Sequence, residues 1–315
     1  MLLRVRHETY YDYEPEVLSS AHALCLHLRA TPCQQVLAQE LMILPQPDGQ
    51  IQEWDAWGNC HVQFQINQPH SHFAVCSHAL LRTRAYAPNP TAGLMRAGLS
   101  CAEVAQRVAA NPALQVWAEP TALTQSDDRI AAWAQGCLQA HEDALWACVR
   151  LMQQLRADFV YLPQSTTVQT HAQQVFAQGS GVCQDFAHLM LAALRSVGLA
   201  ARYVSGYLLS APPVPEGDSV LLGGDASHAW VSVFIPNAQG CSEGLWCDFC
   251  PTNGRMGWHS PGEDFVTLAW GRDYQDVAPV GGVLTGAQTQ RLRVVVQVQT
   301  LADDGAAVAV DEEGS

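Results

Sequence analysis

The stretch Gly179-Ser180-Gly181-Val182-Cys183-Gln184-Asp185-Phe186 places a cysteine where a glycine-rich turn gives way to a helix. Residues 182–197 carry the clearest helical pattern in the chain, because apolar residues recur at helical spacing and Gly198 follows where a C-terminal cap belongs. The apolar face comprises Phe186, Leu189, Met190, Ala193, Leu194 and Val197. Cys183 precedes this face, so the pattern predicts a core helix whose first turn presents a thiol.

The predicted position of Cys183 suits a nucleophile. The first turn of a helix has unpaired backbone N–H groups and a partial positive charge, which favour a thiolate over a thiol. The same N–H groups can bind a developing oxyanion. Considered alone, however, a cysteine at this place is more often an ordinary packing residue, so a catalytic assignment needs a partner base.

Two downstream segments supply candidate partners for Cys183. A strand is predicted over residues 228–235, with His228 at its start and Trp230 on the same face. A nucleophilic cysteine takes its base from such a histidine on another element. In the next predicted strand, residues 245–250, Asp248 and Cys250 share one face, and a carboxylate there could fix the tautomer of the imidazole.

These segments together resemble the bacterial transglutaminase-like family, within the papain-like cysteine hydrolase superfamily. The resemblance rests on residues 181–188, 201–207, 226–230, 251–254 and 271–280, and on residues 7–13 and 55–59 of the N-terminal part. It implies that Cys183 is the nucleophile and His228 its base. We expect Gln184, Tyr207 and Trp230 to line the substrate site.

The chain departs from the family pattern at one position. The resemblance implies an Asp directly before Pro-Thr-Asn as the third catalytic residue, but this chain has Cys250 there, with Asp248 two residues upstream. Asp248 could orient His228 after a small shift, or Cys250 could do so weakly, since a thiol is a poor acceptor. The third outcome is an impaired site.

The predicted fold is α+β. Residues 1–87 form a β-rich N-terminal domain, because strand-like runs are separated by turns such as Asp48-Gly49 and Gly58-Asn59. The Ala87-Pro88-Asn89-Pro90 break leads into a helical connecting segment over 88–155, which includes a helix over 143–155. Residues 156–300 form a papain-like core with the nucleophile helix packed on an antiparallel sheet, and residues 301–315 form an acidic tail.

Composition excludes several partners. The formal net charge of −14 argues against nucleic acid and anionic membranes as partners. The sequence has no stretch of 18 apolar residues, so it predicts no membrane-spanning helix. Its polar N-terminus does not resemble a signal peptide. Eleven cysteines without a disulfide-like spacing predict reduced thiols and a cytoplasmic location.

The sequence therefore predicts hydrolysis or transfer at amide bonds of a peptide or small amide, through a thioester on Cys183. It predicts no cofactor and no metal. It does not separate a protease or amidase from a transglutaminase, and it leaves the oligomeric state open. One alternative is a non-catalytic module that binds peptides or amides. Another is a zinc protein using Cys247 and Cys250, although no second pair of ligands has fitting spacing.

Overall fold

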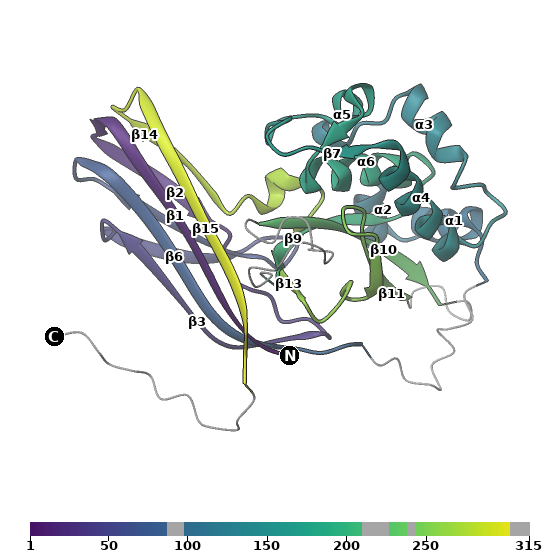
Figure 1. The fold of residues 1–315 in the computed structure, drawn as a ribbon, viewed down its shortest axis with the longest axis horizontal. Helices are drawn as coiled ribbons and strands as arrows, with labels where there is room; N and C mark the ends of the chain where they lie inside the picture. The colour runs from purple at the N-terminus through teal and green to yellow at the C-terminus, as the bar shows by residue number, and fades with distance from the viewer. Residues whose placement is uncertain (87–97, 210–226, 238–243, 303–315) are drawn as a thin grey trace, which may run out of the picture.

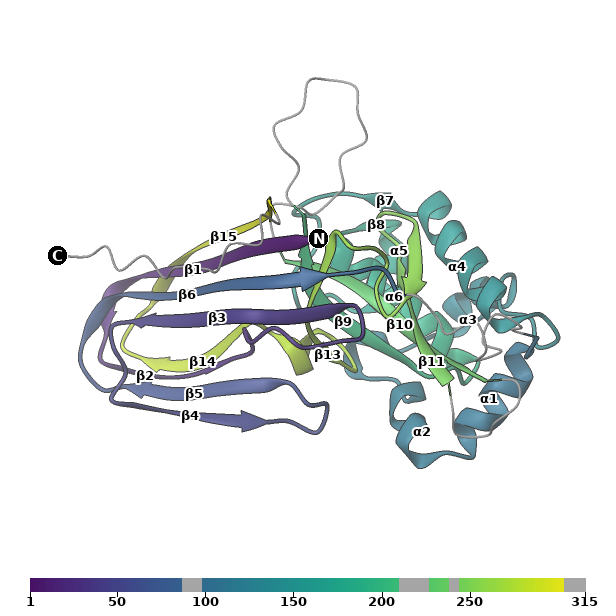
Figure 2. The same cartoon turned by 90° about the horizontal axis from the view of Figure 1, so that it is seen from below.

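Two antiparallel sheets of four strands form a sandwich, six strands of which come from the N-terminal part of the chain and two from residues 280–301 (Figures 1 and 2). The structure is a computed structural model that describes residues 1–86, 98–209, 227–237 and 244–302. The first sheet has the order β15-β1-β6-β3 and the second β14-β2-β5-β4. The strands are β1 (Leu2–Val17), β2 (Ser19–Leu24), β3 (Gln34–Leu44), β4 (Gly49–Trp54), β5 (Cys60–Ile66), β6 (His70–Thr83), β14 (Val280–Thr285) and β15 (Thr289–Leu301).

The sandwich corrects one predicted boundary. We expected residues 156–300 to form the core, but β14 pairs with β2, and β15 pairs with β1 from Leu2↔Leu301 to Glu14↔Thr289. The run of alternating valines near residue 296 predicts a strand, and β15 is one. Alternation does not identify the partner strand, so the sequence alone left residues 289–300 within the predicted core.

The remaining strands form a five-stranded antiparallel sheet with the order β12-β11-β10-β9-β13. Every residue of β9 and β10 is buried, as expected for central strands covered on both faces. The strands are β9 (Ala201–Leu208), β10 (His228–Pro236), β11 (Gly244–Cys250), β12 (Arg255–Trp258) and β13 (Phe265–Gly271), with a separate short parallel pair, β7 (Val160–Tyr161) and β8 (Ser180–Gly181).

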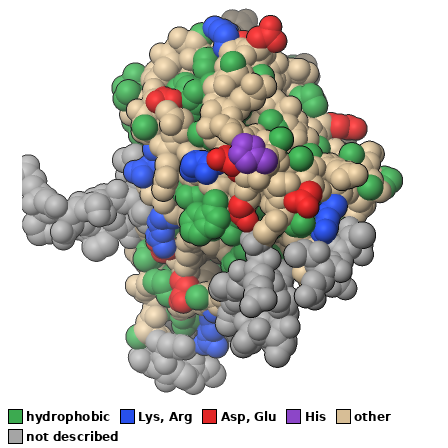
Figure 3. Space-filling view, turned by 90° about the vertical axis from the view of Figure 1, so that its right-hand side faces the viewer, with side chains coloured by type: hydrophobic (Ala, Val, Ile, Leu, Met, Phe, Trp, Pro, Cys, Tyr) green, Lys and Arg blue, Asp and Glu red, His purple; other side chains and the backbone are tan. Residues whose placement is uncertain are grey.

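Helices gather beside this sheet (Figure 1), and α6 packs directly on β9 and β10. The surface at the helical end of the molecule mixes apolar side chains with charged ones of both signs (Figure 3). The helices are α1 (Cys101–Ala109), α2 (Pro112–Ala118), η1 (Ala122–Thr124), α3 (Asp128–Gln135), α4 (Ala144–Asp158), α5 (Ala172–Gln178), α6 (Cys183–Ser196) and η2 (Tyr274–Val277). The α+β fold class and the predicted helices near 143–155 and 182–197 are confirmed.

The sandwich and the five-stranded sheet are joined along the edge of β13. Gln34 Nε2 donates to the Thr267 carbonyl at 2.7 Å, and the Thr267 N–H donates to Gln34 Oε1 at 2.8 Å. Asn59 makes the same paired contact with the backbone of Trp270, at 2.9 and 3.1 Å. Because each amide side chain acts as a short piece of backbone, the two together satisfy edge groups of β13.

Within the described residues, no helix is long and apolar enough to cross a membrane. The predicted break at residues 87–90 lies outside the described residues. So does the predicted acidic tail over 301–315, apart from its first two residues.

Candidate active site

Cys183 is the first residue of α6, and a carboxylate holds the turn before it. Asp185 Oδ2 accepts from the Val182 N–H at 2.7 Å and from Thr166 Oγ1 at 2.5 Å, which caps the helix. Gly181 is required here, because a Cβ at this position would lie 2.7 Å from Cβ of Asp185. The thiol is partly exposed at the helix N-terminus.

His228 begins β10, and its backbone neighbours lie against Cys183. The Cys183 sulfur lies 4.0 Å from the Ser227 carbonyl oxygen and accepts from the Ala229 N–H. The imidazole is buried beside the rings of Trp230 and Phe265. Its Nδ1 has no hydrogen-bond partner among the described residues. The segments that carry Cys183 and His228 therefore meet, and one ring nitrogen of His228 makes no hydrogen bond within the described residues.

The other ring nitrogen of His228 faces Cys250. His228 Nε2 lies 3.2 Å from Cys250 Sγ, at the last residue of β11. The same sulfur receives the N–H of Asn253 at 3.4 Å and Asn253 Nδ2 at 3.6 Å. Of the two candidates for the third residue, Cys250 is thus the one that contacts the His228 ring.

Asp248 lies elsewhere on the same face of β11. Its Oδ2 accepts from Trp230 Nε1 at 2.8 Å, and its Oδ1 accepts from the Ser232 hydroxyl. Burial raises the pKa of Asp248, and the positive charge of Arg202 opposes this rise. Residues two apart on a strand are separated by about 6.6 Å, so Asp248 is one pleat away from the position that reaches His228.

The protonation of the site differs from the sequence expectation. We expected the helix N-terminus to favour the Cys183 thiolate, but burial raises the pKa of Cys183 to about 12, and the N–H groups of Ala229 and Gln184 only partly oppose it. Burial also lowers the pKa of His228 to about 3. The resting pair is therefore a neutral thiol and a neutral imidazole, because desolvation outweighs the helix dipole.

The three predicted substrate contacts have partners inside the protein. Trp230 is fully buried against Asp248, and the Tyr207 hydroxyl is buried 2.8 Å from Nδ1 of His7 in the sandwich. Gln184 Nε2 donates to the Val168 carbonyl at 3.1 Å. These contacts anchor the walls of the site, and direct contact of the three side chains with substrate stays a prediction.

Sequence analysis assigned no role to three residues that shape the site. Asp185 had a signal, because it is the third residue after the N-cap, where acids cap helices. Asn253 lies in the Pro-Thr-Asn segment, three residues after Cys250. Tyr161 pairs with Gly181 across β7 and β8, and burial raises its pKa to about 12. No sequence pattern connects Tyr161 with Cys183.

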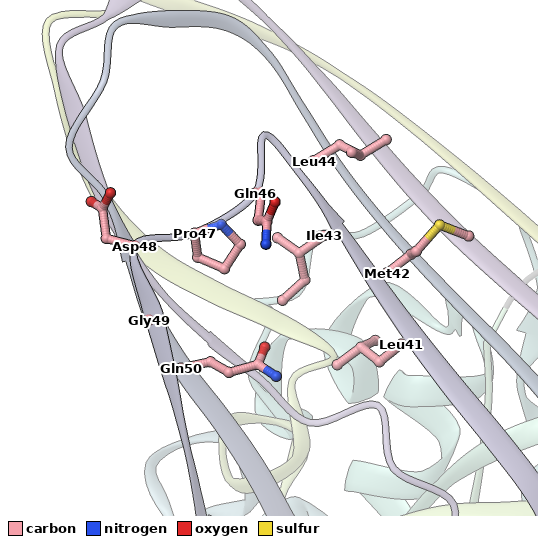
Figure 4. Close-up of a pocket in the computed structure, with 9 residues that line it drawn as sticks. All are labelled: Leu41, Met42, Ile43, Leu44, Gln46, Pro47, Asp48, Gly49 and Gln50. Carbon is pink, nitrogen blue, oxygen red and sulfur yellow. The ribbon is translucent and has the colours of Figure 1, made fainter.

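Two other features lie apart from this site. Cys247 packs in the main apolar core, whereas Cys250 packs with the cluster around Trp230, so the two thiols of the Cys-x-x-Cys segment face opposite sides of β11. A pocket lined by residues 41–44 and 46–50 opens at the turn between β3 and β4 (Figure 4). Its only titratable side chain is that of Asp48, and it belongs to the sandwich rather than to the sheet that carries His228.

Comparison with known sequences identifies relatives over almost the whole chain. An uncharacterized protein of Mycobacterium tuberculosis is 32% identical over 312 residues, covering 94% of this chain and 91% of the relative. An uncharacterized protein of Mycobacterium leprae is 31% identical over 300 residues, covering 95% of this chain and 99% of the relative.

The same architecture occurs in a solved structure. A Cytophaga hutchinsonii protein named "Putative Cysteine Protease" superposes with a TM-score of 0.70 at 19% identity, covering 99% of this chain and 94% of that one. This similarity establishes the fold alone. Residues 131–251 match the family model described as transglutaminase-like superfamily, and residues 3–82 match the bacterial transglutaminase-like N-terminal region. The chain therefore belongs to the transglutaminase-like superfamily and carries the bacterial transglutaminase-like N-terminal region.

Proposed function

We propose that the protein is a cysteine-type hydrolase or acyltransferase acting on amide bonds, with Cys183 as nucleophile and His228 as general base. One observation carries the proposal. His228 has its Nε2 held by Cys250 at 3.2 Å and its Nδ1 buried without a partner among the described residues, while Cys183 lies against the backbone on both sides of it. A base needs one nitrogen fixed and the other free.

The reaction begins when Nδ1 of His228 takes the proton of Cys183. The thiolate attacks the amide carbonyl, and the backbone N–H of Cys183 supports the oxyanion. The imidazolium then returns the proton to the leaving amine or ammonia, which leaves a thioester on Cys183. Water resolves the thioester to an acid, and an amine resolves it to a new amide. No cofactor takes part in these steps.

The substrate is a peptide or a small amide, and we place the protein in the cytoplasm. All ten described cysteines are free thiols, which fits a reducing compartment. The net charge of −14 disfavours polyanionic partners.

The test is the alkylation rate of individual cysteines by iodoacetamide as the pH is raised from neutral, followed by peptide mass spectrometry. Once His228 can accept a proton, we expect Cys183 to react at least about tenfold faster than Cys76, which is the other partly exposed cysteine among the described residues. His228→Ala should slow Cys183 and leave Cys76 unchanged. His72→Ala, at a side chain that is 82% exposed, is the matched control.

Equal labelling of both cysteines, with no effect of His228→Ala, would overturn the proposal. The binding module without catalysis would then be the better account. A glutaminyl peptide with and without an added primary amine separates transfer from hydrolysis. The chain contains no lysine, so cross-linking of the enzyme through its own lysine side chains does not complicate this assay.

A further inference from the structure

Hydrogen-bond donors surround the sulfur of Cys250. The backbone N–H of Asn253 lies at 3.4 Å and its side-chain Nδ2 at 3.6 Å, and the backbone of Thr252 also donates to this sulfur. The side chain is fully buried, in the apolar cluster that includes Val204, Trp230 and Phe265. A buried atom with several converging donors is a site for an anion or a strong acceptor, and a neutral thiol is a poor one.

The thiol proton of Cys250 has one place to go. Among the described residues, the acceptor within hydrogen-bond distance of this sulfur is His228 Nε2, at 3.2 Å. If S–H donates to Nε2, a neutral imidazole must carry its own proton on Nδ1. That nitrogen is then unable to accept the proton of Cys183. A neutral Cys250 therefore favours the wrong tautomer for a base.

The charged and titratable groups around Cys250 are few. His228 faces it from β10, and Cys183 at the start of α6 and Arg255 of β12 interact with it electrostatically. Arg255 is itself paired with Asp264. Burial raises the pKa of Cys250 to about 11, and the donors from Asn253 and Thr252 oppose the rise. Among the described residues, none of these groups is an acceptor that could hold the thiol proton away from His228.

We infer that Cys250 is a positioning residue that controls the tautomer of His228, holding it in the reactive form as a thiolate and in the unreactive form as a thiol. The inference rests on the proposed function of Cys183 and His228. Cys250 contacts no substrate in this scheme. It acts through His228, and its state decides whether Nδ1 has a free lone pair.

The switch between the two forms releases one proton. In the unreactive form, S–H of Cys250 donates to Nε2 and the single proton of the neutral imidazole is on Nδ1. In the reactive form, the sulfur proton has passed to Nε2, the Nδ1 proton has left to solvent, and the thiolate accepts from Nε2–H. No oxidant or cofactor takes part, and activity rises with pH as Cys250 ionises.

The experiment compares the pH dependence of amide turnover in the full chain and in three variants. Cys250→Asp supplies a permanent anion, and Cys250→Asn supplies a neutral acceptor, so both should hold Nε2–H at neutral pH. We expect each to raise neutral turnover at least about tenfold over the wild type and to reach its plateau at lower pH. Cys250→Ser keeps a hydroxyl proton that can donate to Nε2, and we expect it to stay low at all pH values.

A second measurement reads the tautomer without turnover. The ¹⁵N chemical shifts of the His228 ring, assigned by their loss in His228→Gln, should show a proton on Nδ1 in the wild type at neutral pH and on Nε2 in Cys250→Asn. A proton on Nε2 in the neutral wild type would overturn the inference, as would identical pH profiles in the wild type and both acceptor variants. In these two cases turnover through Cys183 remains and the proposed function stands. If neither acceptor variant turns over any amide and Cys183 also fails the alkylation test, the proposed function itself has failed.

Discussion

Near its end, strand β11 carries two buried side chains that share one face but differ in chemistry and in their partners. Asp248 is a buried acid bound by Trp230 and Ser232, and Cys250 is a buried thiol bound by His228 and Asn253. Asp248 therefore bonds to structural side chains of the sheet, whereas Cys250 contacts His228. The comparison shows that the site is defined by position on the strand, since the stronger hydrogen-bond acceptor, two residues away, contacts neither ring nitrogen of His228.

The Asp248 end of this comparison extends across the sheet. Ser232 of β10 pairs with Asp248 on one side and with Arg202 of β9 on the other. The Arg202 guanidinium lies 4.1 Å from the ring centroid of Trp246 and 3.6 Å from that of Trp270. A buried cation and a buried acid thus lie on one face, and each reduces the cost of burying the other.

The largest expected effect is on turnover and concerns Cys183, the proposed nucleophile on the side of the site that Cys250 faces. Cys183→Ala should lower amide turnover by about 10⁴-fold or more, because the nucleophile is lost. The free energy of unfolding should change little, since the thiol is partly exposed. Steady-state turnover and urea denaturation of the same preparations check this. Cys76→Ala, at the other partly exposed cysteine, should retain turnover. Full activity of Cys183→Ala would show that turnover does not use Cys183, and the contact of Cys250 with His228 would then have no role in catalysis.

The next effect is on stability and concerns the acid. Asp248→Ala should lower the free energy of unfolding by about 3–5 kcal/mol, because Trp230 Nε1 and the Ser232 hydroxyl lose their buried acceptor and Arg202 loses the negative charge that opposes its own. Urea denaturation measures the loss, and folded protein should still react selectively at Cys183. If Asp248→Ala instead keeps its stability and loses turnover as Cys183→Ala does, Asp248 is the third catalytic residue after all.

Lowering the pH should reduce the free energy of unfolding through His228, the ring that Cys250 contacts. The pKa of His228 is lowered from 6.5 to about 3 by burial, so the unfolded chain binds a proton below pH 6.5 that the folded chain does not. The free energy of unfolding from this group is therefore intact above pH 6.5 and falls by about 1.4 kcal/mol per pH unit below it, or about 2 kcal/mol at pH 5. His228→Gln should flatten the pH dependence of stability by this amount. Equal slopes in both proteins would contradict the burial of a neutral imidazole.

The smallest effect lies at the edge of the sheet beyond Arg202. Asn59→Ala removes two hydrogen bonds to the backbone of Trp270, and we expect a loss of about 1–2 kcal/mol in the free energy of unfolding. Cys183 alkylation should keep its rate. Asn67→Ala, whose amide bonds Asp48 at an exposed turn, is the matched control and should cost less. A slower Cys183 in Asn59→Ala alone would show that the edge contact also orders the site.

Sequence predicted the parts of the site that depend on local pattern. The helix after Cys183 and the strand after His228 follow from apolar periodicity, and the resemblance to the family paired the two segments. The choice between Asp248 and Cys250 did not follow, because a period of two places both on one face and only the register against β10 decides which one reaches His228. The resemblance to the family pointed to position 250, where the structure places the contact.

Other features depended on contacts distant in sequence. The Tyr207 hydroxyl contacts His7, which lies 200 residues away in the chain, and no local pattern predicts that contact. The strands β2 and β4 were not predicted, and β15 was included in the core over residues 156–300, because alternation identifies a strand without naming its neighbour. Burial at Cys183 likewise reversed the expected protonation, since desolvation is a property of the assembled core.

The pairing of β15 with β1 also has a consequence for how the chain is made. Strand β1 is translated long before β15, its neighbour on one side of the sheet, which ends at Leu301. Until then the long strand β1 has an open edge, while β6 is already available on its other side. A sheet that joins residues so far apart in the chain is slow to form and exposed to association with other chains during synthesis. We expect nascent chains stopped before residue 289 to depend on chaperones, even though every residue of the candidate site has by then been translated.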